Sequence, residues 1–180
     1  MSDTYVISDT HFGHVNMYTF LRPDGSPVRP FTMPDCDTLM VANWQKTIRP
    51  SDIVYFLGDW TLNTPDQQHL NTLGRLLPGH KILVPGNHDH LHRWDYLEAG
   101  FSQIHGSYQY KGIWLTHMPL HPQSLGARVN IHGHTHERNI HDTRYVNVSV
   151  EQINYTPQPI DLMIKRGIVH GGDADAVRTH

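Results

Sequence analysis

The chain has 180 residues, of which 38% are hydrophobic, and this length fits one domain with a sizeable core. Its net charge of −3 argues against a dedicated nucleic-acid-binding module, although it leaves room for an enzyme that touches one or two phosphates. No apolar run approaches the length of a membrane span, and Cys36, the single cysteine, excludes an internal disulfide. With no signal peptide visible, we expect a cytoplasmic protein.

Short apolar segments predict strands that alternate with helices in the first half of the chain and dominate the second half. Strands are expected at residues 5–8, 52–57, 81–84, 103–116 (two strands that turn near Lys111 and Gly112), 127–132, 145–150 and 160–164. A first helix is expected at 39–48, with Asp35 or Asp37 as its N-cap. A second is expected to follow a capping box at 64–67 and to end at residue 77, and a third is expected at 91–99. This order predicts a mixed α/β fold in which two stacked sheets carry helices on their outer faces.

Residues 12–34 contain four prolines and two glycines, which is too many for a helix. We therefore expect a long loop there, and loops of that length usually carry function or move. The sequence does not indicate what this loop does. No linker divides the chain, so residues 1–170 are expected to form a single domain, with residues 171–180 as a flexible polar tail.

Polar clusters directly follow most of the predicted strands. They are Asp9 with His11, Asp59, Asn87 with His88 and Asp89, His117, and the pair His134 and His136. Carboxylate oxygens and imidazole nitrogens are ligands for divalent metals, and α/β sheets build their sites at the carboxyl ends of neighbouring strands. Gly58, Gly86 and Gly133 each stand just before a cluster, where a missing side chain allows a tight turn or a close backbone approach. The sequence therefore predicts a metal site.

In order and spacing, these clusters resemble the motifs of the calcineurin-like metallophosphoesterase superfamily over roughly residues 4–150. The small single-domain bacterial and phage-type members are the most similar. The resemblance implies a four-layer αββα sandwich of two mixed sheets that binds two divalent ions. It also implies that Asp59 bridges the ions, that Asp9, His11 and His136 complete the first site, and that Asn87, His117 and His134 complete the second.

The resemblance further implies a reaction. A hydroxide that bridges the two ions, its pKa lowered by them, would attack phosphorus without a covalent intermediate. His88 would donate to the phosphate or the leaving group, a task that suits imidazole chemistry near neutral pH. Asp89 would accept a hydrogen bond from His88 and so fix its tautomer.

Further residues are candidates for contact with the substrate. His14, which ends the Asp-Thr-His-Phe-Gly-His form of the first motif, and His121 are two of them. Arg128 and Arg138 are the others, because an arginine fork binds phosphate oxygens bidentately. For His14 an ordinary surface or supporting role is an equally good interpretation, for His121 a place in the pocket wall is favoured, and each arginine is more often a solvated charge. Among metals we expect Mn²⁺ first, with Fe, Zn, Ni, Co or Mg compatible with the same ligands.

A compact chain leaves such a site open to diesters, so we expect hydrolysis of phosphodiesters, including nucleotides or cyclic nucleotides. Phosphomonoesterase or small nuclease activity is the alternative. A metal-binding scaffold without catalysis is disfavoured because every motif position is filled, and a metal-storage protein would bind many ions rather than two. The expected partner is a small phosphoester or nucleotide, with nucleic acid only as a substrate, no membrane, and an open oligomeric state.

Overall fold

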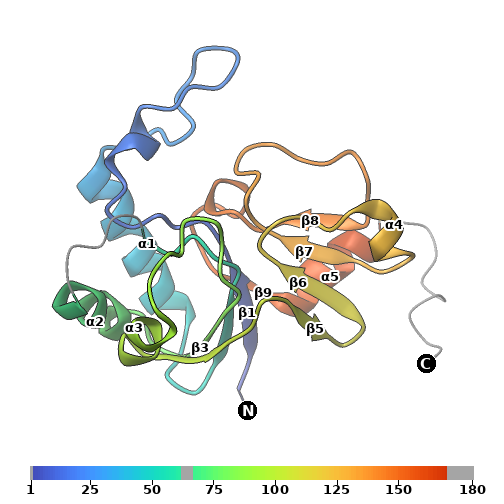
Figure 1. Cartoon of the computed structure of the whole chain (residues 1–180). Helices are drawn as coiled ribbons and strands as arrows, with labels where there is room; N and C mark the ends of the chain where they lie inside the picture. Colours follow the sequence, from blue (N-terminus) through green and yellow to red (C-terminus); the bar gives the residue numbers. More distant parts are fainter. Residues whose placement is uncertain (1, 62–66, 170–180) are drawn as a thin grey trace.

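Two mixed β-sheets form the centre of the computed structural model, which describes residues 2–61 and 67–169 (Figure 1). In spatial order, the first sheet consists of β4 (Phe101–Ile104), β3 (His80–Leu83), β2 (Ile53–Phe56), β1 (Thr4–Ile7) and β9 (Gln158–Pro159). The second consists of β5 (Tyr108–Tyr110), β6 (Ile113–Thr116), β7 (Asn130–His132) and β8 (Tyr145–Asn147). Neighbouring strands are parallel in both sheets except at β9, which is antiparallel to β1, and at β5, which is antiparallel to β6.

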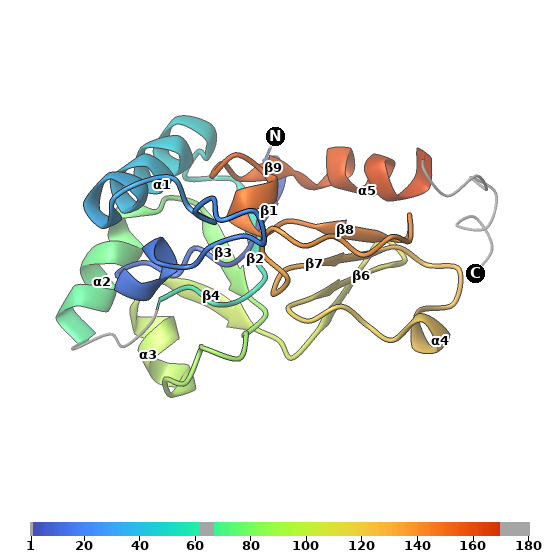
Figure 2. The same cartoon turned by 90° about the horizontal axis from the view of Figure 1, so that it is seen from above.

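Helices flank the sheets. Three of them, α1 (Met33–Thr47), α2 (Gln67–Leu76) and α3 (Arg93–Glu98), gather at one end of the molecule, and α4 (Pro122–Leu125) and α5 (Ile160–Val169) lie at the other (Figure 2). Trp44 of α1 stacks on Phe56 of β2 with 6.1 Å between ring centroids, whereas Tyr55 of β2 contacts Tyr108 of β5 at 5.0 Å. Because successive residues of one strand reach a helix and the other sheet, the four-layer αββα sandwich is confirmed.

The two sheets are joined at the carboxyl end of β1. The amide of Ser8 donates to the carbonyl of Val148, and the amide of Val150 donates to the carbonyl of Ser8, each at 3.1 Å. As a result, the loops that follow β1, β2 and β3 meet the loops that follow β6, β7 and β8. Every polar cluster of the sequence lies in these loops.

Most of the predicted strands are confirmed with shorter bounds, and the turn at Lys111 and Gly112 joins β5 to β6 as expected. The prediction for residues 160–164 is wrong, because this segment begins α5. Ile160 and Met163 are buried while Asp161 is exposed, which is a helical spacing that a run of five residues is too short to reveal. Residues 103–104 belong to β4 of the first sheet rather than to the hairpin.

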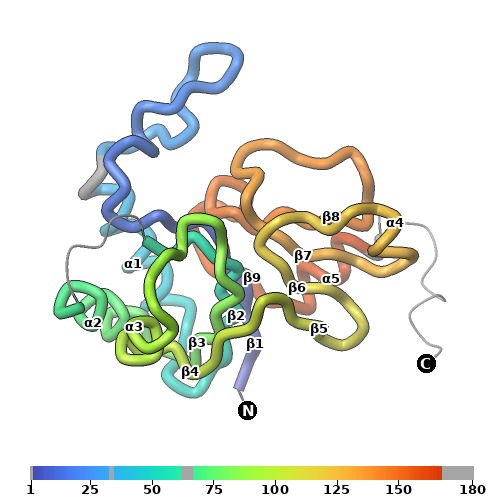
Figure 3. The backbone as a smooth tube through the Cα atoms, viewed as in Figure 1, coloured from blue at the N-terminus to red at the C-terminus, as the bar shows by residue number. Residues whose placement is uncertain are grey.

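The proline-rich segment is irregular, as expected, apart from a 3₁₀ turn at Val15–Tyr18, and it projects from the body of the molecule beside α1 (Figure 3). The predicted start of the following helix is wrong, since α1 begins at Met33 and neither Asp35 nor Asp37 is its N-cap. Asp37 instead accepts a hydrogen bond from the amide of Gly13 at 2.8 Å. This contact ties the base of the projecting segment to α1.

Among the residues that the structure describes, no helix combines the length and the apolar character needed to cross a membrane. Residues 64–66 of the expected capping box and the expected flexible tail at 171–180 fall outside the described ranges. Both therefore stay predictions.

Candidate metal centre

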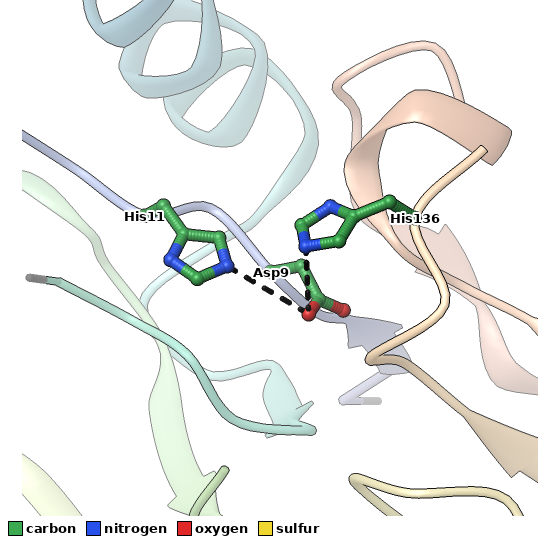
Figure 4. A group of neighbouring side chains, drawn as sticks. All are labelled: Asp9, His11 and His136. Carbon is green, nitrogen blue, oxygen red and sulfur yellow. Dashed lines mark ion pairs between the residues drawn. The ribbon is translucent and has the colours of Figure 1, made fainter. Parts of the chain in front are cut away.

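Two groups of carboxylate and imidazole side chains lie side by side where the two sheets meet. Asp9, His11 and His136 form the first group, and Asp59, His117 and His134 form the second; in each, one potential ligand atom per residue lies within 4.8 Å of the others. Figure 4 shows the rings of His11 and His136 directed at Asp9, whose Oδ1 lies 3.9 Å from Nε2 of each ring. Residues predicted as metal ligands from distant parts of the sequence thus meet in space.

Asp59 stands between the two groups. Its Oδ2 lies 3.5 Å from Nε2 of His11 in the first group and 3.3 Å from Nε2 of His117 in the second. Asn87, the remaining predicted ligand, places its Oδ1 3.0 Å from Nε2 of His117 and so joins the second group. An oxygen shared between the groups is in the position that a bridging ligand requires.

The burial of His11 is a physical reason to expect ions here. Its side chain is 1% exposed, and among the described residues neither ring nitrogen has a hydrogen-bond partner. Buried polar atoms are nearly always satisfied, so this imidazole requires a further partner. Burial lowers the pKa of His11 to about 2, which leaves a neutral ring with a lone pair for a cation. The mixed carboxylate, amide and imidazole donors therefore fit a pair of divalent ions.

Neighbouring acceptors determine which nitrogen of two imidazoles faces the groups. Nδ1 of His117 lies 2.7 Å from the carbonyl oxygen of Leu57, and Nδ1 of His136 lies 3.2 Å from Oε2 of Glu151. A carbonyl and an ionised carboxylate can only accept, so Nδ1 carries the proton in each ring. In the neutral ring, Nε2 then offers its lone pair toward the carboxylates, as a metal ligand must.

The backbone of both groups adopts an uncommon conformation. Asp9, His11, Asp59, His134 and His136 all have φ between 47° and 68°, a region that residues with a side chain rarely adopt. Each such residue costs on the order of 1–3 kcal/mol, so surrounding contacts have to hold it. Strain of this kind concentrates at functional sites.

Gly86 and Gly133 are required by close packing. A Cβ on Gly86 would overlap Oδ1 of Asp59, and a Cβ on Gly133 would overlap Oγ of Ser8 and Oδ2 of Asp9. Neither glycine has a positive φ, so the missing side chain matters here rather than backbone freedom. The predicted close approach of the backbone is confirmed at both positions.

His88 lies beside the first group, with its ring centroid 5.2 Å from that of His11, and is partly exposed. Asp89 makes different contacts from the one expected. The expected hydrogen bond was from the ring of His88. Instead, Oδ2 of Asp89 accepts from the backbone amides of Asp59 at 2.7 Å and Gly86 at 2.8 Å. Asp89 thus fastens the loop after β3 to the loop after β2 and holds the backbone of Asp59.

The four predicted substrate contacts are placed differently from one another. His14 lies close to the first group, with its ring centroid 5.5 Å from that of His11. His121 is exposed and caps α4 with a ring nitrogen. Arg128 and Arg138 are exposed, and Nε of Arg138 lies 3.6 Å from Oε1 of the neighbouring Glu137. The contacts of His121 and Arg138 fit local structural roles, and a part of any of the four residues in substrate binding stays a prediction.

Two buried side chains that the sequence interpretation missed, Arg29 and Glu151, support the first group. Oε1 of Glu151 accepts from Nε of Arg29 at 2.7 Å, and Oε2 accepts from Nδ1 of His136 at 3.2 Å. Although burial opposes ionisation, the hydrogen bond from His136 and the charge of Arg29 lower the pKa of Glu151 to about 2. Glu151 follows the strand predicted at 145–150, so the strand-end rule could have found it. Arg29 lies in the proline-rich loop and gave no such signal.

Comparisons with known proteins agree with this geometry. A family model described as calcineurin-like phosphoesterase matches residues 3–180. The uncharacterized protein MJ1445 of Methanocaldococcus jannaschii is 32% identical over 178 residues, which cover 92% of this chain and 91% of that protein. The Gene 66 protein of Mycobacterium phage D29 is 34% identical over 94 residues, 51% of this chain and 43% of that protein. The crystal structure of AQ665, a protein of unknown function from Aquifex aeolicus, is 27% identical with a TM-score of 0.65, covering 92% of this chain and 99% of that one.

Gly133→Ala should disrupt the first group. The added methyl would push against the carboxylate of Asp9, and we expect weaker Mn²⁺ binding together with a loss of roughly 1–3 kcal/mol in the free energy of unfolding. Gly106→Ala is the matched control, because nothing lies within 4 Å of its added Cβ. Metal titration and thermal melting of both variants provide the measurement, and equal behaviour of the two would contradict the steric argument.

Metal binding should release a proton from His117. In the metal-free protein, burial disfavours the charged ring, but the hydrogen bond to Asp59 and the charges of Asp9 and Asp59 raise the pKa of His117 to about 9. A cation that binds Nε2 at neutral pH must displace that proton. Below about pH 9, Mn²⁺ affinity should therefore fall as the pH falls, by up to about tenfold per pH unit. Calorimetric titrations in buffers of different ionisation enthalpy would report the proton, and buffer-independent heats would refute its release.

Proposed function

The chain belongs to the calcineurin-like phosphoesterase family, and we propose that it is a metal-dependent phosphodiesterase. The shared oxygen carries this proposal. Oδ2 of Asp59 lies within 3.5 Å of Nε2 of His11 in one group and of Nε2 of His117 in the other. Two ions that share a ligand stand close together, which suits hydrolysis of a phosphoester. A metal-storage protein would have no need of such sharing.

The proposed ligand set leaves the centre with excess positive charge. Of the seven donors, Asp9 and Asp59 are the carboxylates, while Asn87 is an amide and the four histidines are imidazoles. When bound, two divalent ions would lower the pKa of water and withdraw charge from phosphorus. Because two carboxylates offset only part of the charge of the ions, the centre would attract an anionic phosphate.

We assign His88 as the proton donor to the leaving oxygen. Its ring is partly exposed beside His11, so a substrate at the metal centre can meet it. The backbone amide of His88 donates to Oδ1 of Asp59 at 2.9 Å, and Asp89 accepts from the amide of Asp59 at 2.7 Å. These two bonds fix the loop that carries His88 relative to the carboxylate of Asp59.

An aromatic side chain near the centre favours diesters with an aryl or nucleoside group. Phe20 is 49% exposed and packs edge-on against His14 with 6.5 Å between ring centroids, and His14 adjoins His11. A base or aryl ring can stack on this surface while the phosphate faces the proposed ligands. A small monoester would leave the surface unused, so phosphomonoesterase activity is the second candidate and nuclease activity the third.

The resident metal and the compartment complete the proposal. We propose Mn²⁺ as the first metal to test, because mixed oxygen and imidazole donors suit it. We also propose the cytoplasm, because Cys36, the single cysteine of the sequence, is a buried free thiol, as is usual in a reducing compartment.

Chelator-stripped protein should regain hydrolysis of bis-p-nitrophenyl phosphate when Mn²⁺ is added. His88→Ala should lower kcat by roughly 10²–10⁴-fold while two ions still bind, since it removes a proton donor and no ligand. Asp59→Ala should lose both metal and activity. Initial rates and metal content measured on the same samples would check this.

Several outcomes would redirect the proposal. Full activity of Asp59→Ala or His134→Ala at a low metal concentration would contradict the proposal. Faster cleavage of the mono-aryl than of the bis-aryl phosphate would indicate a phosphomonoesterase, and cleavage of single-stranded DNA or RNA would indicate a nuclease. Protein that binds two ions but hydrolyses none of these substrates would point to a scaffold.

Phe20→Ala should raise KM for bis-p-nitrophenyl phosphate by roughly three- to tenfold with little change in kcat, because it removes about one aromatic stacking contact. Leu21→Ala is the matched control, since Leu21 is 64% exposed on the same segment. Steady-state kinetics of both variants decide the matter. Equal KM values for the two would remove Phe20 from the substrate surface.

A further inference from the structure

Arg29 is a buried charge at the base of the projecting 12–34 segment. It is 1% exposed, and its guanidinium donates to three partners. Nε donates to Oε1 of Glu151 at 2.7 Å, while the two terminal nitrogens donate to the carbonyl oxygens of Thr10 at 2.8 Å and Asp9 at 2.6 Å. The rigid fork therefore connects a buried carboxylate with the backbone of the first metal motif.

Glu151 joins Arg29 to His136. Its side chain is 1% exposed. Oε1 accepts from Nε of Arg29, and Oε2 accepts from Nδ1 of His136 at 3.2 Å. Because Nδ1 is engaged, Nε2 of His136 faces Oδ1 of Asp9, 3.9 Å away. The ion pair thus holds two of the three members of the first group, Asp9 through its carbonyl and His136 through its ring.

We propose that Arg29 and Glu151 are positioning residues that set the affinity of the first metal site and leave the second unaffected. This inference rests on the proposed function, because it assumes a centre that holds two ions. The second group has a different support, since Nδ1 of His117 donates to the backbone carbonyl of Leu57 at 2.7 Å. The ring of His136 in the first group is thus held by a side chain, whereas the ring of His117 in the second group is held by main chain.

The conformation of the first group explains why support is needed. Asp9 and His136 have φ of 60° and 48°, from which a residue with a side chain relaxes unless contacts prevent it. The hydrogen bonds of Arg29 to the carbonyl of Asp9, and of Glu151 to the ring of His136, oppose that relaxation. A buried ion pair contributes little to stability as such, so holding ligands accounts better for its burial.

The test compares Mn²⁺ binding to chelator-stripped proteins by calorimetric titration, with thermal melting as a check on folding. One double variant combines Arg29→Met with Glu151→Leu, which removes both charges and leaves no unpaired buried charge. We expect one of its two ions to bind roughly 10–100-fold more weakly and the other to bind as in the wild type. The second double variant, Arg29→Met with Glu151→Gln, should recover part of the loss, because an amide oxygen still accepts from Nδ1 of His136.

Two single variants complete the design. Arg49→Met breaks the ion pair with Asp52, 2.9 Å long, at the amino end of β2 and hence at the other end of the sheet. It should lower the melting temperature and leave the affinity for both ions unchanged. Arg29→Lys keeps a charge opposite Glu151 but gives up the fork, so it should fold and still bind one ion more weakly. It covers the case in which the double variants fail to fold.

The outcomes separate this inference from the proposed function. Wild-type protein that binds two ions, together with Arg29 and Glu151 variants that keep both affinities or lose both equally, would overturn the inference and leave the proposed function standing. Equal effects of Glu151→Leu and Glu151→Gln in the two double variants would overturn the orienting role of Glu151. Wild-type protein that binds fewer than two ions would overturn the two-ion centre and the inference with it.

Discussion

One carboxylate oxygen, Oδ2 of Asp59, lies between imidazoles carried by two different sheets, and the architecture of the centre depends on that position. His11 follows β1 of the first sheet, whereas His117 follows β6 of the second. The two sheets can supply them together only because the chain after β1 pairs with the chain after β8 through Ser8. The same crowding explains why Gly86 has no side chain, since a Cβ there would overlap the carboxylate of Asp59.

The charges of the centre show how the fold tolerates buried acids. Burial opposes ionisation of Asp59, yet the hydrogen bond and charge of His117 lower the pKa of Asp59 to about 2. The proton on His117 thus supplies a positive charge beside Asp59. Because the pKa of His117 rises from 6.5 to about 9 on folding, this stabilisation is complete below pH 6.5 and is lost as the pH rises through 9. A bound ion would take over the same role at higher pH.

The sequence predicted which carboxylate and imidazole side chains gather at the centre, because each of them carries a local signal. A polar cluster directly after an apolar strand can be recognised without any knowledge of the partner strand, and the carboxyl ends of parallel strands then bring the clusters together. Contacts between distant residues gave no such signal. Arg29 and Glu151 are 122 positions apart, and nothing near Arg29 indicates that it is buried. The strand prediction for residues 160–164 was wrong because its local signal is ambiguous. A short apolar run fits a strand and a helix equally well.

The projecting segment shows how an irregular loop can hold a candidate metal ligand in place. It carries His14 and Phe20 beside the proposed substrate surface and Arg29 beneath the first group. Its amino-terminal base is fixed where the amide of Gly13 donates to Asp37 of α1. Its prolines restrict the unfolded chain, so less entropy is lost when the segment becomes ordered without helix or sheet. The proposed substrate contact and the geometry of the candidate ligands therefore depend on one stretch of backbone, which gives a physical reason for so many prolines in a loop of that length.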